Sequence, residues 1–122
     1  MSTIALIGFR GSGKTTLGRW LAEERSMPFL DTDQEVLKHL NYPSVSEVWE
    51  AIGEAGWRKA EAEVIPRLLT DGGVIALGGG APFVEEVKTV LMHVQVVLNL
   101  TASPDVTAHR IESDDDRPPL SS

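Results

Sequence analysis

Residues 8–15, with the sequence GFRGSGKT, match the pattern G-x-x-x-x-G-K-[ST] at every defined position. In this pattern the backbone N–H groups of a turn converge on phosphate oxygens, because glycines accept positive φ and let the phosphates come close. Lys14 would reach the terminal phosphates, and Thr15 would offer its hydroxyl to Mg²⁺. The segment therefore predicts a nucleoside triphosphate site, and it leaves the reaction of that nucleotide open.

The residues on either side of this loop support the prediction. Residues 3–7 are a short apolar run that is typical of a buried parallel strand, and Leu17, Trp20 and Leu21 recur at helical spacing after the loop. A strand, a loop and a helix in this order aim the N-terminus of the helix at an anion.

Two carboxylates, Asp31 and Asp33, end a second short run that begins at Pro28 and is expected to be a strand. Open α/β sheets bind their ligands at the carboxyl ends of their strands. Because residues two apart in an extended backbone point the same way, both carboxylates would face one cleft beside the phosphate loop. One would support Mg²⁺ and the other would meet a substrate hydroxyl. An equally weighted alternative is that Asp33 caps the next helix, with Glu35 in its first turn.

Arginines and glycines further along the chain offer more candidate contacts. Arg58 precedes Glu61 by three residues on a predicted helix, so it either forms a solvated ion pair or faces the cleft and binds a substrate carboxylate. Residues 78–80 are all glycine at the end of a predicted strand, and they form either a flexible turn or a set of N–H groups for a small ligand. Arg110 and Arg117 are either solvated charges or cations that close over the phosphates.

These residues require a framework of alternating strands and helices. Strands are expected at residues 3–7, 28–33, 74–77 and 94–100. Helical patterns separate them, and the crossover between parallel strands is right-handed. The sequence therefore predicts an α/β fold with a parallel sheet covered by helices on both faces.

Several helix boundaries are also predicted. Ser44 and Glu47 form a capping box, and the helix that they open should end at Gly53. Its apolar face would comprise Val48, Trp49 and Ile52. Pro66 should kink or break the helix that follows, because proline cannot donate to the carbonyl four residues earlier. A last helix is expected from residue 103 or 105 to about residue 111.

Composition narrows the class of protein. The chain has 122 residues, 42% of them hydrophobic, which is enough for one domain over residues 1–122. Its formal net charge of −7 argues against nucleic acid or an anionic membrane as a partner. There is no cysteine, and His39, His93 and His109 share no ligand spacing. No apolar run approaches a membrane span and no leader precedes the first strand, so we expect a soluble, cytoplasmic protein.

Five motifs together resemble those of shikimate kinase, in the same order and at similar separations. They are Gly11-x-Gly13-Lys14-Thr15, Leu30-Asp31-Thr32-Asp33, Gly53-Glu54-x-x-Trp57-Arg58-x-x-Glu61, Leu77-Gly78-Gly79-Gly80 and Asp116-Arg117-Pro118. The resemblance covers nearly the whole chain and is far more specific than the phosphate loop alone. It implies a three-layer P-loop fold and ATP-dependent phosphorylation of the 3-hydroxyl of shikimate, a step towards chorismate and the aromatic amino acids.

The resemblance also implies which residues bind the nucleotide and the metal. The phosphates of ATP would be cradled by Gly11, Ser12, Gly13, Lys14, Thr15 and Thr16. Thr15 would bind Mg²⁺, and Asp31 would support the metal. Arg117 would belong to a lid of about residues 112–122, and Arg110 would lie near the nucleotide.

For the acceptor, the resemblance implies a second group of residues. Asp33 would hold the shikimate hydroxyls and help deprotonate the attacking one, and Arg58 would bind the carboxylate. Gly79 and Gly80 would contact the ring. The catalytic residues of this monomeric enzyme would be Lys14, Asp33 and Arg117.

The chain also departs from the family pattern. Trp57 stands where the family usually has phenylalanine, and Pro119 replaces a common leucine and would stiffen the lid. Family members usually continue past the lid into a helix with another shikimate-binding arginine, an edge strand and a terminal helix. We therefore expect a sheet without the usual last strand and terminal helix, in a fragment or in a naturally short relative.

Two other functions stay open at this stage. The first is another small-molecule P-loop kinase, acting on gluconate or a nucleoside monophosphate, against which Arg58 and the glycine run argue. The second is a non-catalytic module that binds a nucleotide or shikimate. A GTPase is disfavoured because the chain has no Asn-Lys-x-Asp signature.

Overall fold

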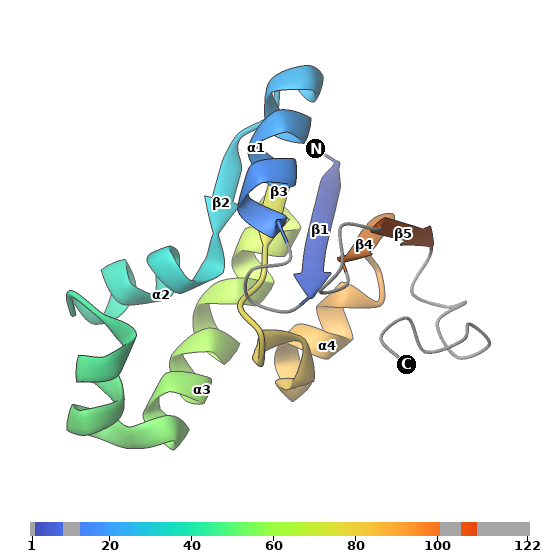
Figure 1. Cartoon of the computed structure of the whole chain (residues 1–122). Coiled ribbons are helices and arrows are strands. Elements are labelled where there is room, and N and C mark those ends of the chain that lie inside the picture. Colours follow the sequence, from blue (N-terminus) through green and yellow to red (C-terminus); the bar gives the residue numbers. More distant parts are fainter. Residues whose placement is uncertain (1, 9–12, 101–105, 110–122) are drawn as a thin grey trace.

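The structure is a computed structural model that describes residues 2–8, 13–100 and 106–109. In this part of the chain one sheet has the strand order β2-β3-β1-β4-β5 (Figure 1). The strands are β1 (Thr3–Gly8), β2 (Phe29–Asp31), β3 (Gly73–Ala76), β4 (Val96–Leu100) and β5 (Val106–His109). The first four pair in parallel, which confirms the expected α/β fold with a parallel sheet.

Helices connect the parallel strands and pack against both faces of the sheet. They are α1 (Lys14–Arg25), α2 (Thr32–Leu40), α3 (Val45–Asp71), the short 3-10 helix η1 (Ala81–Phe83) and α4 (Glu85–Leu91). Figure 1 shows α2 and the first part of α3 projecting beyond β2, away from β4 and β5. None of the described helices is both long enough and apolar enough to cross a membrane.

The sheet buries both of its faces, and the alternation of residues along each strand decides which core each side chain joins. In β1, Ile4 and Leu6 pack with Ala22 of α1, whereas Ala5 packs with the helices on the opposite face. In β3, Ile75 shares the face of Ala5, where α2, α3 and α4 supply the larger of the two apolar clusters. A sheet covered on both faces places its ligand sites at the strand ends.

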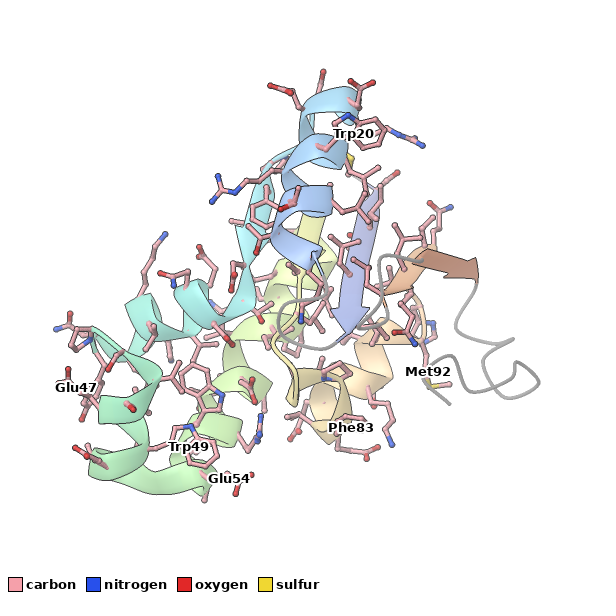
Figure 2. The ribbon with its side chains drawn as sticks, in the orientation of Figure 1. Trp20, Glu47, Trp49, Glu54, Phe83 and Met92 are labelled. Carbon is pink, nitrogen blue, oxygen red and sulfur yellow. The ribbon has the colours of Figure 1, made fainter. Side chains whose placement is uncertain are left out.

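The apolar patterns of α1 and α3 were only partly correct. Trp20 is 56% exposed, and Trp49 and Ile52 are 42% and 43% exposed. Figure 2 shows Trp20 on α1 and Trp49 on the first part of α3. On α1 the buried positions are Gly18 and Ala22, small residues one turn apart that bring the helix close to the sheet. Trp20 therefore lies on the side of α1 that the sheet does not cover.

Helix α3 leaves helical geometry at Gly53, whereas it continues through Pro66. The Ser44 Oγ accepts the N–H of Glu47 at 3.3 Å, as expected of the cap, and Gly53 is non-helical with φ 74° and ψ 178°. The break expected at Pro66 is absent, since the helix runs on to Asp71. The buried residues Ile65 and Leu69 hold that turn against the core.

The helix expected from residue 103 or 105 to about 111 is wrong for its described part. Residues 106–109 form β5, which pairs antiparallel with β4 through Val97↔His109 and Leu100↔Val106. Val106 and Thr107 are β-branched, which favours a strand. The connection over residues 101–105 is too short for a parallel crossover, so the pair is antiparallel. The proposed lid at residues 112–122 lies outside the described residues.

Candidate active site

Lys14 joins the carboxyl ends of two neighbouring strands. Its Nζ donates to the carbonyl of Gly8 at the end of β1 (2.7 Å) and to that of Leu77 just after β3 (2.9 Å). Gly13 precedes α1 in the left-handed region, with φ 95°, and offers no side-chain cap. No acidic residue lies in the first turn of α1, where Thr15 and Thr16 are exposed. This helix terminus therefore suits an anion, because its dipole and its first N–H groups favour negative charge.

The two aspartates at the end of β2 and the start of α2 have different structural roles. Asp31 is the N-cap of α2, and its Oδ1 accepts the N–H of Asp33 at 2.9 Å and that of Gln34 at 3.4 Å. The alternative in which Asp33 caps this helix is therefore wrong. The expectation that an extended backbone points both carboxylates the same way is also wrong, because α2 begins at Thr32.

Asp33 nevertheless faces the glycine run. A Cβ built on Gly78 would collide with the Oδ1 of Asp33, so the carboxylate lies against the backbone just after β3. Glycine at position 78 is what permits this approach. The residues from β2 and β3 thus converge as expected, although through the first turn of α2.

Thr32 fixes this convergence, and sequence reasoning missed it. Its side chain is fully buried, and its Oγ1 accepts the N–H of Gly78 at 2.9 Å. The parallel register of Asp31 with Ala76 brings the two residues together. The one sequence signal for this role was a threonine hydroxyl between two aspartates.

Arg58 forms a partly buried ion pair. Its Nη1 donates to the Oε1 of Glu61 at 2.7 Å, and its Nε lies 3.6 Å from the Oε2 of Glu54. Glu61 is 1% exposed, so the alternative of a solvated pair is wrong. A Cβ on Gly80 would lie 2.5 Å from the Nη2 of Arg58, which places the guanidinium against the glycine run.

The sequence named Glu61 as a possible ion-pair partner of Arg58 and within a family motif, but not as a site residue, although it lies on the apolar face of α3. It follows the buried Trp57 by four residues and precedes the buried Val64 by three. Burial raises the pKa of the Glu61 carboxyl, the hydrogen bond and charge of Arg58 lower it, and the charge of Asp33 raises it. A hydrogen bond from the Trp57 side chain also lowers this pKa. A glutamate on an apolar helix face was the available signal.

One continuous cluster therefore connects the predicted site residues. Lys14 binds the carbonyl of Leu77 just after β3, and Asp33 lies against Gly78. The charge of Asp33 also acts on Glu61, which binds Arg58 beside Gly80. Gly79 lies between these contacts, and among the described residues no atom comes within 4 Å of a Cβ built on it. Gly11, Ser12, Arg110 and Arg117 lie outside the described residues.

Comparison with known proteins identifies the family. The family model described as shikimate kinase matches residues 10–122. The chain belongs to the shikimate kinase family. It is 41% identical over 119 residues to the shikimate kinase of Rhodopseudomonas palustris, covering 96% of this chain and 58% of that relative. It is 36% identical over 114 residues to that of Enterococcus faecalis, covering 93% of this chain and 67% of the relative.

Solved shikimate kinases have the same fold. The enzyme of Acinetobacter baumannii, in complex with shikimate, superimposes with a TM-score of 0.76 at 35% identity, over 82% of this chain and 56% of that one. The enzyme of Aquifex aeolicus gives a TM-score of 0.71 at 38% identity, over 78% and 56% of the two chains. The chain therefore spans between half and about two thirds of the length of these relatives.

Proposed function

We propose that the protein is a shikimate kinase that transfers the γ-phosphoryl group of ATP to the 3-hydroxyl of shikimate. The observation that carries the proposal is the cluster in which a phosphate-loop lysine, a carboxylate and a carboxylate-binding arginine meet around one glycine run. A phosphoryl acceptor with both a hydroxyl and a carboxylate matches these groups. The family supports the assignment, and the Acinetobacter relative was solved with shikimate.

On the nucleotide side, the phosphates would lie at the N-terminus of α1, in the loop of Gly11, Ser12 and Gly13 with Thr16 beside it. Lys14 would turn from its two carbonyl acceptors towards the phosphate oxygens. When bound, ATP would supply the phosphoryl group and Mg²⁺ would neutralise part of its charge.

The residues present also fit the metal. Thr15 has an exposed side chain in the first turn of α1 and offers a hydroxyl oxygen. Asp31 is the last residue of β2 and caps α2 through its Oδ1, so the direction of its carboxylate is fixed. Mg²⁺ usually keeps several waters and takes only one or two protein ligands besides phosphate. We assign Thr15 as a direct ligand and Asp31 as a support through water.

On the acceptor side, Arg58 would bind the carboxylate of shikimate through its planar fork. Glu61 accepts a hydrogen bond from one nitrogen of that fork, and the backbone of Gly80 lies against both of its terminal nitrogens. Asp33 would accept the proton of the attacking hydroxyl, and the open space at Gly79 would receive the ring. Arg117 would cover the phosphates from the lid and stabilise charge on the transferred group, and Arg110 would lie near the nucleotide.

The remaining assignments follow from this chemistry. An ATP-dependent step on a small soluble metabolite suits a monomeric cytoplasmic enzyme. The net charge of −7 disfavours nucleic acid and anionic membranes as partners.

A coupled assay of ADP release tests the function. We expect release from the 122-residue chain that depends on shikimate and that gluconate does not replace. Calorimetry with shikimate and with ATP should run in parallel. Turnover with gluconate but not with shikimate would refute shikimate as the acceptor. Binding of both shikimate and ATP without turnover would make the chain a binding module.

A further inference from the structure

Two carboxylates contact the guanidinium of Arg58 in very different ways. Glu61 accepts a hydrogen bond from Nη1 at 2.7 Å and its side chain is 1% exposed. The Oε2 of Glu54 lies 3.6 Å from Nε, on a side chain that is 60% exposed. This second distance is too long for a hydrogen bond, and exposed ion pairs contribute little to stability. The Glu61 contact is therefore fixed, whereas the Glu54 contact is easily broken.

The break in α3 at Gly53 puts Glu54 in this position. Gly53 is non-helical, so Glu54 begins the helical segment that carries Arg58. The helix dipole favours a carboxylate in a first turn, and a glutamate four residues before an arginine lies on the same helix face. These two effects keep the Glu54 carboxylate beside Arg58.

The surroundings of Arg58 leave one edge of its fork for an incoming carboxylate. A carboxylate pairs with two nitrogens at once either at the end of the fork, through Nη1 and Nη2, or at its side, through Nε and Nη2. At the end, Glu61 binds Nη1, and a Cβ built on Gly80 would lie 2.5 Å from Nη2 and 2.6 Å from Nη1. At the side, the carboxylate of Glu54 faces Nε. A second carboxylate would therefore meet Glu54 at this side.

We propose that Glu54 is an internal competitor for the Nε side of Arg58, and that the carboxylate of the acceptor displaces it on binding. Glu61 keeps its hydrogen bond to Nη1 throughout, so the guanidinium stays in place while its side changes partner. When the product leaves with its carboxylate, Glu54 returns to Nε. The acceptor in this inference rests on the proposed function, whereas the contact between Glu54 and Arg58 does not.

The first experiment compares the kinetics of shikimate turnover in the wild type and in Glu54→Gln, which removes the charge and keeps the size of the side chain. Loss of an exposed ion pair corresponds to about a two- to fivefold change in an equilibrium constant, so the KM for shikimate should fall by about this factor. The kcat should not change, because Glu54 is displaced in both the substrate complex and the transition state. A KM that rises or stays the same would overturn the inference.

Two further variants separate the contact from the charge. Glu54→Asp keeps the charge but is one methylene shorter, so its carboxylate lies farther from Nε and its KM should resemble that of Glu54→Gln. A KM like that of the wild type would show that a long-range field acts and that no competition exists. Glu47→Gln is the matched control, because Glu47 is an exposed glutamate of the same helix that lies well away from Glu54 (Figure 2). Its KM should equal that of the wild type.

The second experiment needs neither shikimate nor turnover. The Nε–H group of Arg58 gives an NMR signal that is identified by its loss in Arg58→Lys. We expect Glu54→Gln, but not Glu47→Gln, to shift this signal. Acetate, used as a simple carboxylate, should move the signal at an about two- to fivefold lower concentration in Glu54→Gln than in the wild type.

The two experiments fail independently of each other. An NMR signal that does not respond to Glu54→Gln would overturn the inference even if shikimate turnover is confirmed. If the signal and its response to acetate change as expected but shikimate is not turned over, the competition at Arg58 holds and the acceptor in the proposed function is wrong.

Discussion

The Thr32 hydroxyl accepts a hydrogen bond from the backbone N–H of Gly78 at 2.9 Å, and this bond ties the start of α2 to the end of β3. Asp33 follows Thr32 and lies against Gly78, so the bond also sets the distance between the proposed base and the glycine run. Because the threonine is fully buried, water cannot replace its oxygen.

Thr32→Val should therefore leave the N–H of Gly78 without its acceptor and destabilise the fold by about 1–3 kcal/mol. Urea unfolding measures the loss, and Thr32→Ser should restore most of it by keeping the oxygen. Thr89→Val is the matched control, since Thr89 donates to the Glu85 carbonyl on an exposed face of α4. Equal losses at the two threonines would show that the Gly78 bond has no special weight.

Alanine at Gly78 should destabilise the fold, whereas alanine at Gly79 should not. A Cβ at position 78 collides with Asp33, whereas the same atom at position 79 meets no described atom within 4 Å. We expect Gly78→Ala to displace Asp33 and lower both thermal stability and kcat. Gly79→Ala should unfold within about 0.5 kcal/mol of the wild type while weakening shikimate binding. Calorimetry and thermal melts of the pair separate the two effects, and a stable, fully active Gly78→Ala protein would contradict the assignment of Asp33.

Arg58→Met should impair both stability and substrate binding, for different reasons. The fold loses the partner of a buried carboxylate, at about 1–3 kcal/mol, and the proposed substrate carboxylate would lose its cation. Adding Glu61→Gln removes the uncompensated charge, so the double variant should regain stability without regaining affinity for shikimate. Unfolding curves and binding isotherms of the four proteins form a double-mutant cycle. Recovery of shikimate binding in the double variant would refute the role of Arg58.

The strand ends and most of the site could be predicted because their signals are local. The glycine pattern before Lys14, the aspartates after β2 and the three glycines after β3 each combine a strand with the residues that follow it directly. Parallel strands with right-handed crossovers then bring these ends to one edge. The family pattern added Arg58, whose orientation the helix spacing alone left open.

What remained unpredicted depends on contacts between distant parts of the chain. The role of Thr32 follows from the register of β2 with β3. That of Glu61 follows from its burial and from the nearby charge of Asp33 on α2. Residues 106–109 were assigned to a helix because local pattern reasoning did not include pairing with β4. The exposure of Trp20 likewise reflects Gly18 and Ala22, which set the face that α1 turns to the sheet.

Glu61 makes a further prediction about the pH dependence of stability. Its pKa in the folded protein is raised above the ordinary 4.5, chiefly by burial and against the opposing influence of Arg58. Between 4.5 and that raised pKa the folded state therefore holds more protons than the unfolded state. By linkage the free energy of unfolding contributed by this group is fully present below 4.5 and is lost as the pH rises through the raised pKa.

Glu61→Gln should remove this contribution, so its free energy of unfolding should fall less than that of the wild type as the pH rises from 4.5 through the acid range. Urea unfolding at a series of pH values measures the slope directly. Glu50→Gln is the control, because Glu50 is an exposed glutamate of the same helix and its removal changes the net charge equally. If both variants flatten the curve alike, the effect arises from net charge, and the buried carboxylate of Glu61 is not its source. If only Glu61→Gln flattens it, the proton uptake belongs to the group that holds Arg58 in place.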